Sequence, residues 1–228
     1  MTVAARFGSG YLRYLRPDGS LSGPLPPAVA DAAALLPLFK QMLFVRTFDT
    51  KAIALQRTGK LGTYASCLGH EATHVGIAAS MQPEDVFAPS YREYGAQFMH
   101  GVKPRDVLMY WGGDERGNDF EVPRNDYPWC VPISTQCLMA AGAALSFKLR
   151  KQPRIAVSCC GDGGSSKTDF YAAVNSAGAY SLPLVLCVIN NGWAISVPRK
   201  AQTGAQTLAQ KGLAVGLERL GAGALDRA

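Results

Sequence analysis

Glycine- and asparagine-containing turns follow two apolar segments of this sequence, and their spacing constrains the fold more than any other feature. Within residues 154–195, one apolar run ends in Gly161-Asp162-Gly163 and a second ends in Asn190-Asn191. The 29 positions from Asp162 to Asn191 fit the turn, helix and strand of one crossover unit. In a parallel sheet both turns leave the carboxyl-terminal edge, where ligands bind in open α/β folds. The pattern therefore predicts a ligand site at that edge.

The residues in these turns suit a metal and an anion. Asp162 and Asn191 carry hard oxygen atoms, which Mg²⁺ binds while sharing its remaining positions with phosphate groups. Gly161, Gly163 and Gly164 leave room for the backbone to approach an anion, and the following helix would present its first N–H groups. The alternative is an ordinary glycine-containing turn in which Asp162 caps the helix, and a GDG alone would favour it. The GDG…NN pair instead predicts a diphosphate held through a metal, and it resembles the thiamine-diphosphate motif.

Composition sets the broad class of protein. With 228 residues and 48% apolar content, the chain can bury a substantial core. No apolar stretch reaches the roughly 18–20 residues needed to span a bilayer. The formal charge of +6 suits anionic ligands, but no basic cluster with interleaved aromatics indicates nucleic acid. The six cysteines form no CxxC pair and fit a reducing cytosol better than a disulfide framework.

Predicted helices alternate with short predicted strands along the chain. Asp31 is placed to cap a helix that runs towards Gly59. Further helices are expected over 71–81, 91–99, 103–110 and 135–149, strands over 86–90 and 154–160, and a loop over 118–132. This alternation predicts an α/β fold, a parallel sheet with helices on both faces. Residues 1–30 are expected to form an irregular arm, and 31–228 the ligand-binding domain, with an atypical tail from about 213.

Several sequence blocks occur in one order that resembles a known family. They are RTFD…LQRTGKLGTYASCLGHEA, PSYREYGA, YWGGDERGN, VPISTQ, GDGGSSKTDFYAAVNSAGAY and NNGWAISVPR. Together they resemble the alpha subunits of the heterotetrameric 2-oxoacid dehydrogenases. The pyruvate type is most similar and the branched-chain type is the runner-up. The likeness covers most of residues 40–212, and no physical role is evident for the WGGDERG block.

This resemblance implies a cofactor site for thiamine diphosphate and Mg²⁺. Asp162 and Asn191 would bind Mg²⁺ by their side chains, and Trp193 by its backbone carbonyl. Gly161, Gly163 and Gly164 would lie along the diphosphate. The family also places Tyr91, Arg92, Ile133 and Ser134 at the cofactor. An arginine fork and a phenol suit phosphate oxygens, although Arg92 could equally form an ordinary ion pair and Ile133 could be plain core.

The implied reaction is oxidative decarboxylation of a 2-oxoacid, with transfer of the acyl group to a lipoyl arm. The partners would be a beta subunit, in an α₂β₂ tetramer, and the lipoyl-bearing dihydrolipoyl acyltransferase. In this family the glutamate that activates the cofactor comes from the beta subunit, so no catalytic residue is expected in this chain. Taken alone it should be inactive. Cytoplasmic localisation is favoured over a mitochondrial presequence, because Pro17-Asp18-Gly19 interrupts any N-terminal amphipathic helix.

Two readings compete with this one. His70-Glu71-Ala72-Thr73-His74 is an HExxH sequence, which on a helix can hold Zn²⁺ for hydrolysis, but the extended metzincin pattern fails after His74. The second is an inactive fragment, because alpha subunits of this family extend well beyond position 228 and the tail is rich in Ala, Gly and Leu. The sequence is therefore expected to lack the C-terminal part of such a subunit.

Overall fold

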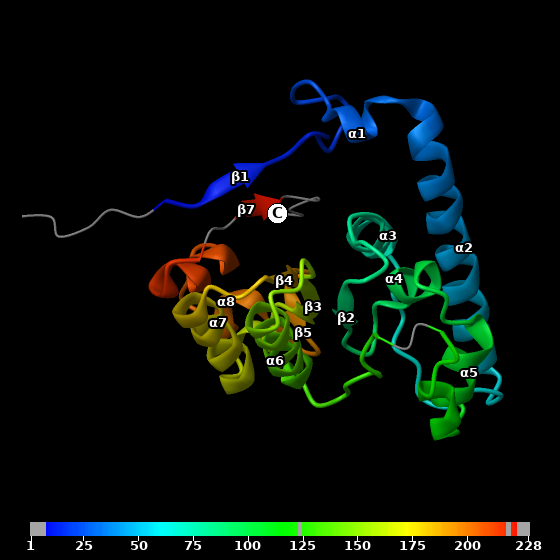
Figure 1. Ribbon diagram of the computed structural model, residues 1–228. Helices are drawn as coiled ribbons and strands as arrows, with labels where there is room; N and C mark the ends of the chain where they lie inside the picture. Colours follow the sequence, from blue (N-terminus) through cyan, green and yellow to red (C-terminus); the bar gives the residue numbers. More distant parts are fainter. Residues whose placement is uncertain (1–7, 123–124, 218–219, 223–228) are drawn as a thin grey trace, which may run out of the picture.

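A three-stranded parallel sheet lies at the centre of the protein. The computed structural model describes residues 8–122, 125–217 and 220–222. The central strands are β2 (Val86–Ala88), β3 (Ala156–Gly161) and β4 (Leu184–Ile189), in the order β2-β3-β4 (Figure 1). Ser158 is paired with Ala88 on one side and with Leu186 on the other. Both strands whose bounds were predicted are present, and both are shorter than expected.

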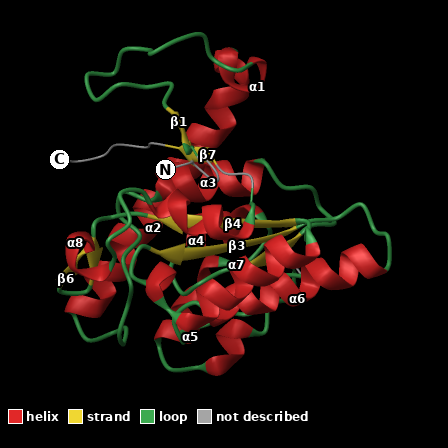
Figure 2. Ribbon diagram, turned by 90° about the vertical axis from the view of Figure 1, so that its left-hand side faces the viewer, coloured by secondary structure: helices red, strands yellow, loops and turns green. Residues whose placement is uncertain are grey.

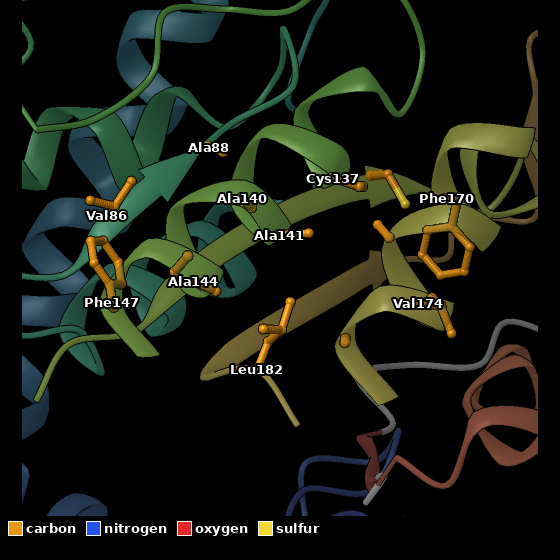
Figure 3. Close-up of a cluster of buried hydrophobic side chains, with 14 residues drawn as sticks. Val86, Ala88, Cys137, Ala140, Ala141, Ala144, Phe147, Phe170, Val174 and Leu182 are labelled. Atoms are coloured by element: carbon orange, nitrogen blue, oxygen red, sulfur yellow. The ribbon is translucent and has the colours of Figure 1, made fainter. Parts of the chain in front are cut away.

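Helices cover the two faces of this sheet. On one face, α6 (Thr135–Leu149) and α7 (Thr168–Tyr180) pack on the strands, and Figure 3 shows the buried side chains between them. On the other face, α3 (Glu71–Ala79) and α4 (Tyr94–Met99) bury Ala78 and Ala96 against Phe87 and Val157. Figure 2 shows β3 and β4 running between these helices. The predicted α/β class, a parallel sheet with helices on both faces, is confirmed.

Small residues set how closely α6 approaches the sheet. Ala140 and Ala144 are completely buried, and Cys137 and Cys160 fill the remaining space between helix and strand. Cysteine in such a position behaves as a small apolar residue. A hydrogen bond of 2.9 Å from Thr135 Oγ1 to an Asp169 carboxylate oxygen also joins the first turns of α6 and α7. The loops that precede both helices are therefore fixed relative to each other.

The longest helix, α2 (Ala32–Arg57), is capped as predicted: the side chain of Asp31 accepts a hydrogen bond of 2.9 Å from Ala33 N. Its second half packs on the body through Val45, Phe48 and Ala52. Its first half extends along the side of the molecule (Figure 1), and large apolar side chains are exposed there: Leu35, Leu36, Phe39, Leu43 and Phe44. The large apolar side chains of this helix are thus only partly buried.

Shorter elements complete the described structure. They are α1 (Pro27–Ala30), α5 (Pro104–Trp111), the 3₁₀ helices η1 (Glu115–Asn118), η2 (Gly164–Ser166) and η3 (Leu208–Val215), the hairpin of β5 (Trp193–Ala194) and β6 (Val197–Pro198), and α8 (Arg199–Gln202). The predicted loop after Asn118 is confirmed in its described residues. No helix in the described ranges is both long and apolar enough to cross a membrane.

Two local expectations are wrong. The predicted helix over 91–99 begins only at Tyr94, because the Glu93 carboxylate accepts hydrogen bonds from the backbone N and hydroxyl of Ser90 and closes a separate turn. The arm over 1–30 is not wholly irregular, since β1 (Gly10–Leu12) pairs in parallel with β7 (Leu220–Ala222). This pairing supplies both short segments with backbone hydrogen-bond partners. Residues 1–7 and most of the tail expected to be atypical beyond 217 lie outside the described residues.

Candidate functional site

The ends of β2, β3 and β4 lie at one edge of the sheet, and the predicted site residues follow them. Asp162 comes directly after β3, and its backbone N donates a hydrogen bond of 3.1 Å to the carbonyl of Ile189, the last residue of β4. Asn190 and Asn191 come directly after Ile189. The two halves of the GDG…NN pattern therefore meet as the spacing predicted.

Gly163 lies so close to the following hairpin that no side chain fits between them. A Cβ built on Gly163 would be 2.4 Å from Cβ of Ala194 in β5. This separation is far below the 3.5–4.0 Å of an ordinary carbon–carbon contact. Glycine at this position is therefore required by the close approach of the two loops. By contrast, a Cβ on Gly161 would meet no atom within 4 Å, which leaves open space beside the first glycine of the motif.

The loop before α6 supports the other side of this turn. The Ser134 hydroxyl donates a hydrogen bond of 2.8 Å to the carbonyl of Gly164. A Cβ on Gly164 would lie 2.7 Å from this hydroxyl oxygen and 3.4 Å from Cγ2 of Ile133. Ser134 is fully buried with a left-handed φ of 70°, whereas Ile133 is largely exposed. The structure thus brings Ile133 and Ser134 to the glycine turn, and their contact with a cofactor stays a prediction.

The Asp162 carboxylate is held inside the site. Its side chain is 1% exposed and accepts a hydrogen bond of 3.0 Å from the side-chain amide of Gln202. The carbonyl of Asp162 accepts from the hydroxyl and backbone N of Ser165, at 2.6 and 3.1 Å. The other amide atom of Gln202, Oε1, is buried without a partner among the described residues. The carboxylate is therefore oriented while keeping acceptor capacity for a cation.

Asn190 and Asn191 form consecutive Asx turns. Their side-chain oxygens accept hydrogen bonds from Gly192 N at 3.1 Å and from Trp193 N at 3.0 Å. Short asparagine side chains commonly bond the backbone two residues ahead in this way. Both asparagines are exposed, as is the Trp193 side chain. The metal-binding roles of Asn191 and Trp193 stay predictions.

Tyr91 and Arg92 lie in the loop after β2, at the same edge of the sheet. The Arg92 guanidinium donates a hydrogen bond to the carbonyl of Ser66 and lies 5.6 Å from the centre of the Tyr91 ring. Ser66 in turn donates 2.7 Å to the Asp49 carboxylate of α2. Asp49 also accepts from the Tyr64 hydroxyl and from Cys67 N, both at 2.8 Å. Arg92 is thus positioned through the loop 61–69, and its contact with a phosphate stays a prediction.

This donor set fits a metal shared with a diphosphate. The described residues contain no group of three or more His, Cys, Asp or Glu that could hold a metal ion by themselves. A single buried carboxylate, an adjacent asparagine and a backbone carbonyl are few ligands, which is how Mg²⁺ on a phosphorylated ligand is usually bound. The open space at Gly161 leaves room for an anion to approach the main chain there, whereas the hairpin fills the space beside Gly163.

The HExxH sequence does not form a zinc site. His74 is completely buried on α3, and burial, with His70 nearby, lowers its pKa to about 3. The Glu71 carboxylate, the general base in that reading, is bound by Arg46 at 2.5 Å and by Gly69 N at 3.0 Å. With its glutamate already paired and no third ligand in the described chain, the motif is part of the α3 packing.

Three polar residues at or behind this edge were not singled out from the sequence: Asp49, Gln202 and Lys211. Asp49 is a charged residue on the buried face of α2, within the sequence RTFD, and this position could have indicated a structural role. Gln202 and Lys211 follow the hairpin in a segment without strong periodicity, so their approach to the glycine turn depends on the tertiary fold.

Comparison with known proteins defines the class. The family model described as "Dehydrogenase E1 component" matches residues 39–223. The chain therefore belongs to the dehydrogenase E1 component family. The match continues past residue 212, where the resemblance was expected to stop, and so includes part of the tail expected to be atypical.

Individual relatives are more specific. The pyruvate dehydrogenase E1 component subunit alpha of Acholeplasma laidlawii is 38% identical over 183 residues, covering 80% of this chain and 53% of that protein. Its Staphylococcus aureus counterpart is 36% identical over 192 residues, covering 84% and 52%. The Staphylococcus epidermidis counterpart is 35% identical over 216 residues, covering 94% and 58%. The chain spans about half the length of these relatives. A solved structure from Mycobacterium smegmatis, assigned to the thiamin diphosphate-dependent enzymes, superposes with a TM-score of 0.43 at 17% identity, over 64% of this chain and 25% of its own.

Proposed function

We propose that this chain acts as the alpha subunit of a pyruvate dehydrogenase E1 component and holds the Mg²⁺-diphosphate end of thiamine diphosphate. The observation that supports it most directly is the buried Asp162 carboxylate in a glycine turn packed against the hairpin that follows Asn191. Membership of the E1 family and the names of the relatives favour pyruvate over branched-chain 2-oxoacids as substrate. The cytoplasm is the proposed location, and the free thiols of all six cysteines fit a reducing compartment.

In this proposal the protein binds and orients, and bound thiamine diphosphate supplies the carbanion-stabilising chemistry of decarboxylation. Asp162, Asn191 and the Trp193 carbonyl would hold Mg²⁺. Backbone groups at Gly161, Gly163 and Gly164 would face the diphosphate, and Tyr91 and Arg92 would add donors from the loop after β2. Ile133 and Ser134 would support the cofactor from the loop before α6. The positions of Asp162 and Gly164 are fixed by Gln202 and Ser134, so this part of the site is pre-organised.

Partner subunits are the second part of the proposal. The relatives are named as alpha subunits, and this chain exposes large apolar side chains both on the first half of α2 and around the site. Near the site these are Ile133, Trp193 and Ile195. Contiguous exposed apolar surface is typical of protein interfaces. We propose a beta subunit as the partner, in an α₂β₂ assembly that delivers the acyl group to the lipoyl arm of a dihydrolipoyl acyltransferase.

The test is a calorimetric titration of thiamine diphosphate into the full chain, co-purified with its beta subunit, with Mg²⁺ and again with EDTA. We expect saturable binding that requires Mg²⁺ and is lost in Asp162→Ala. The matched control is Asp18→Ala, which changes an aspartate in the N-terminal arm and should bind normally. Mg²⁺-independent binding, or unchanged affinity in Asp162→Ala, would refute the site. Absence of binding to a folded, associated wild-type pair would indicate the inactive-fragment reading.

A further inference from the structure

Lys211 is a buried cation directly behind the glycine turn. It lies in η3, is 7% exposed, and its ammonium group donates three hydrogen bonds. Two go to Ser165, at 2.7 Å to the carbonyl and 2.9 Å to the hydroxyl, and one goes to the Ser166 hydroxyl at 3.2 Å. The ammonium also lies 5.3 Å from the centre of the Tyr171 ring. All of its hydrogen-bond partners come from the loop 162–166.

These hydrogen-bond partners carry no formal charge. A buried ammonium is costly, by several kcal/mol, unless a negative group compensates it. Among the described residues, Lys211 forms no ion pair with a carboxylate. The adjacent start of α7 adds the partial positive charge of a 13-residue helix. Lys211 and the start of α7 therefore add positive charge behind the loop, and the carboxylates of Asp162 and of Asp169 in the first turn of α7 offset part of it.

Lys211 also acts on the geometry of Asp162. The Ser165 hydroxyl accepts from Lys211 and donates 2.6 Å to the Asp162 carbonyl, so a continuous chain of hydrogen bonds joins the two residues. The Ser166 hydroxyl donates 3.1 Å to the carbonyl of Gln202, whose amide holds the Asp162 carboxylate. The segment after the hairpin thus holds the backbone of Asp162 through Lys211 and its side chain through Gln202.

We propose that Lys211 is a positioning residue of the cofactor site, which fixes the Asp162 loop through Ser165 and supplies positive charge for a bound diphosphate. This inference rests on the proposed function. It assigns Lys211 a role without contact to reacting atoms, so its variants should change affinity for the diphosphate end and leave association with a partner unaffected.

The experiment compares Lys211→Met, Lys211→Arg and wild type. Calorimetry at 10 °C measures dissociation constants for Mg²⁺-thiamine diphosphate and for Mg²⁺-pyrophosphate, which probes the diphosphate end alone. The matched control is Lys148→Met, because Lys148 caps the opposite end of α7 through the carbonyls of Tyr180 and Ser181. Circular dichroism establishes that each variant is folded under the conditions of the titration.

Lys211→Met should weaken both ligands by about tenfold or more, since a charge-assisted interaction is worth roughly 1.5–3 kcal/mol. Lys211→Arg should restore affinity to within about threefold of wild type, and Lys148→Met should leave it unchanged. If Lys211 only anchors η3, Lys211→Met should lower the thermal midpoint without changing the affinity of the folded protein for either ligand. That result would overturn the proposal. If wild type binds neither ligand, the proposed function fails instead.

A second variant keeps the test decisive if Lys211→Met does not fold. Ser165→Ala removes the hydroxyl that links Lys211 to the Asp162 carbonyl and keeps the ammonium in place. It should weaken Mg²⁺-pyrophosphate by about threefold or more, because one neutral hydrogen bond contributes roughly 0.5–1.5 kcal/mol. Wild-type affinity in a folded Ser165→Ala protein would contradict the relay.

Discussion

Gly163→Ala should separate the two halves of the site by a purely steric effect. The backbone of Gly163 has φ −61° and ψ −37°, angles that alanine adopts without strain. The added methyl carbon would lie 2.4 Å from Cβ of Ala194, so the β5–β6 hairpin must move by roughly 1 Å or more to restore a normal contact. Such overpacking costs about 1–3 kcal/mol. For a chain of this size, 2 kcal/mol lowers the thermal midpoint by about 4–8 °C.

The assay is thermal unfolding followed by circular dichroism, together with Mg²⁺-pyrophosphate affinity. The matched control is Gly161→Ala, two residues away in the same motif, where the new methyl would meet no atom within 4 Å. It should change stability by less than about 1 kcal/mol in either direction. We expect only Gly163→Ala to lose stability, and its affinity should also fall about tenfold. Gly161→Ala is a control for stability alone, because its methyl would enter the open space proposed for the anion. Equal midpoints for the two variants would refute the close-packing argument.

Three further predictions concern the surrounding structure, and urea denaturation tests each of them. Gly178→Ala places a methyl 2.2 Å from the carbonyl oxygen of Val215 and should lower the free energy of unfolding by about 1–3 kcal/mol. Gly142→Ala, which has open space around it on α6, should raise it by about 0.5–1 kcal/mol. The reverse order of stability would contradict the packing of η3 on α7. The folded-state pKa of His74, which lies beside His70, Glu71 and Arg92, is lowered to about 3. Burial of the neutral imidazole therefore costs no stability above pH 6.5, but the free energy of unfolding falls as the pH drops from 6.5 towards 3, because only the unfolded chain takes up the proton. Between pH 7 and pH 5 wild type should therefore lose about 2 kcal/mol more than His74→Leu, and parallel pH profiles would disprove this. Asp49→Ala leaves three hydrogen-bond donors without their acceptor and should lower the free energy of unfolding by about 3 kcal/mol. A free energy of unfolding within about 1 kcal/mol of wild type would contradict this prediction.

Much of the fold could be predicted from local signals in the sequence. The cap at Asp31 and the helix over 135–149 were predicted with their observed starts, because capping and small-residue patterns are local. The meeting of Asp162 with the end of β4 followed from strand direction and spacing alone. The helix α4 was predicted to begin at residue 91 but begins at Tyr94, because a turn between Ser90 and Glu93 replaces its first turn. The buried Glu93 carboxylate stabilises that turn, and its burial depends on the tertiary fold.

The candidate site was only partly accessible to the same reasoning. The glycine turn lies beside the loop at Ile133 and Ser134, because adjacent strands and helices position both. Gln202 and Lys211 approach from a segment whose path is set by the hairpin and by packing on α7, which no spacing rule encodes. The side-chain oxygen of Asn191 accepts a hydrogen bond within its own turn, and its role as a metal ligand stays a prediction.

The outer edge of β4 has a practical consequence for handling the protein. In the described residues β4 pairs with β3 on one side only, and its sequence LVLCVI contains neither a charge nor a proline. Natural edge strands usually carry such residues, because an unprotected apolar edge can pair with a strand from another molecule. We therefore expect the purified chain to self-associate through β4 as its concentration rises. Val185→Lys, at an exposed position on this strand, should raise solubility with little loss of stability.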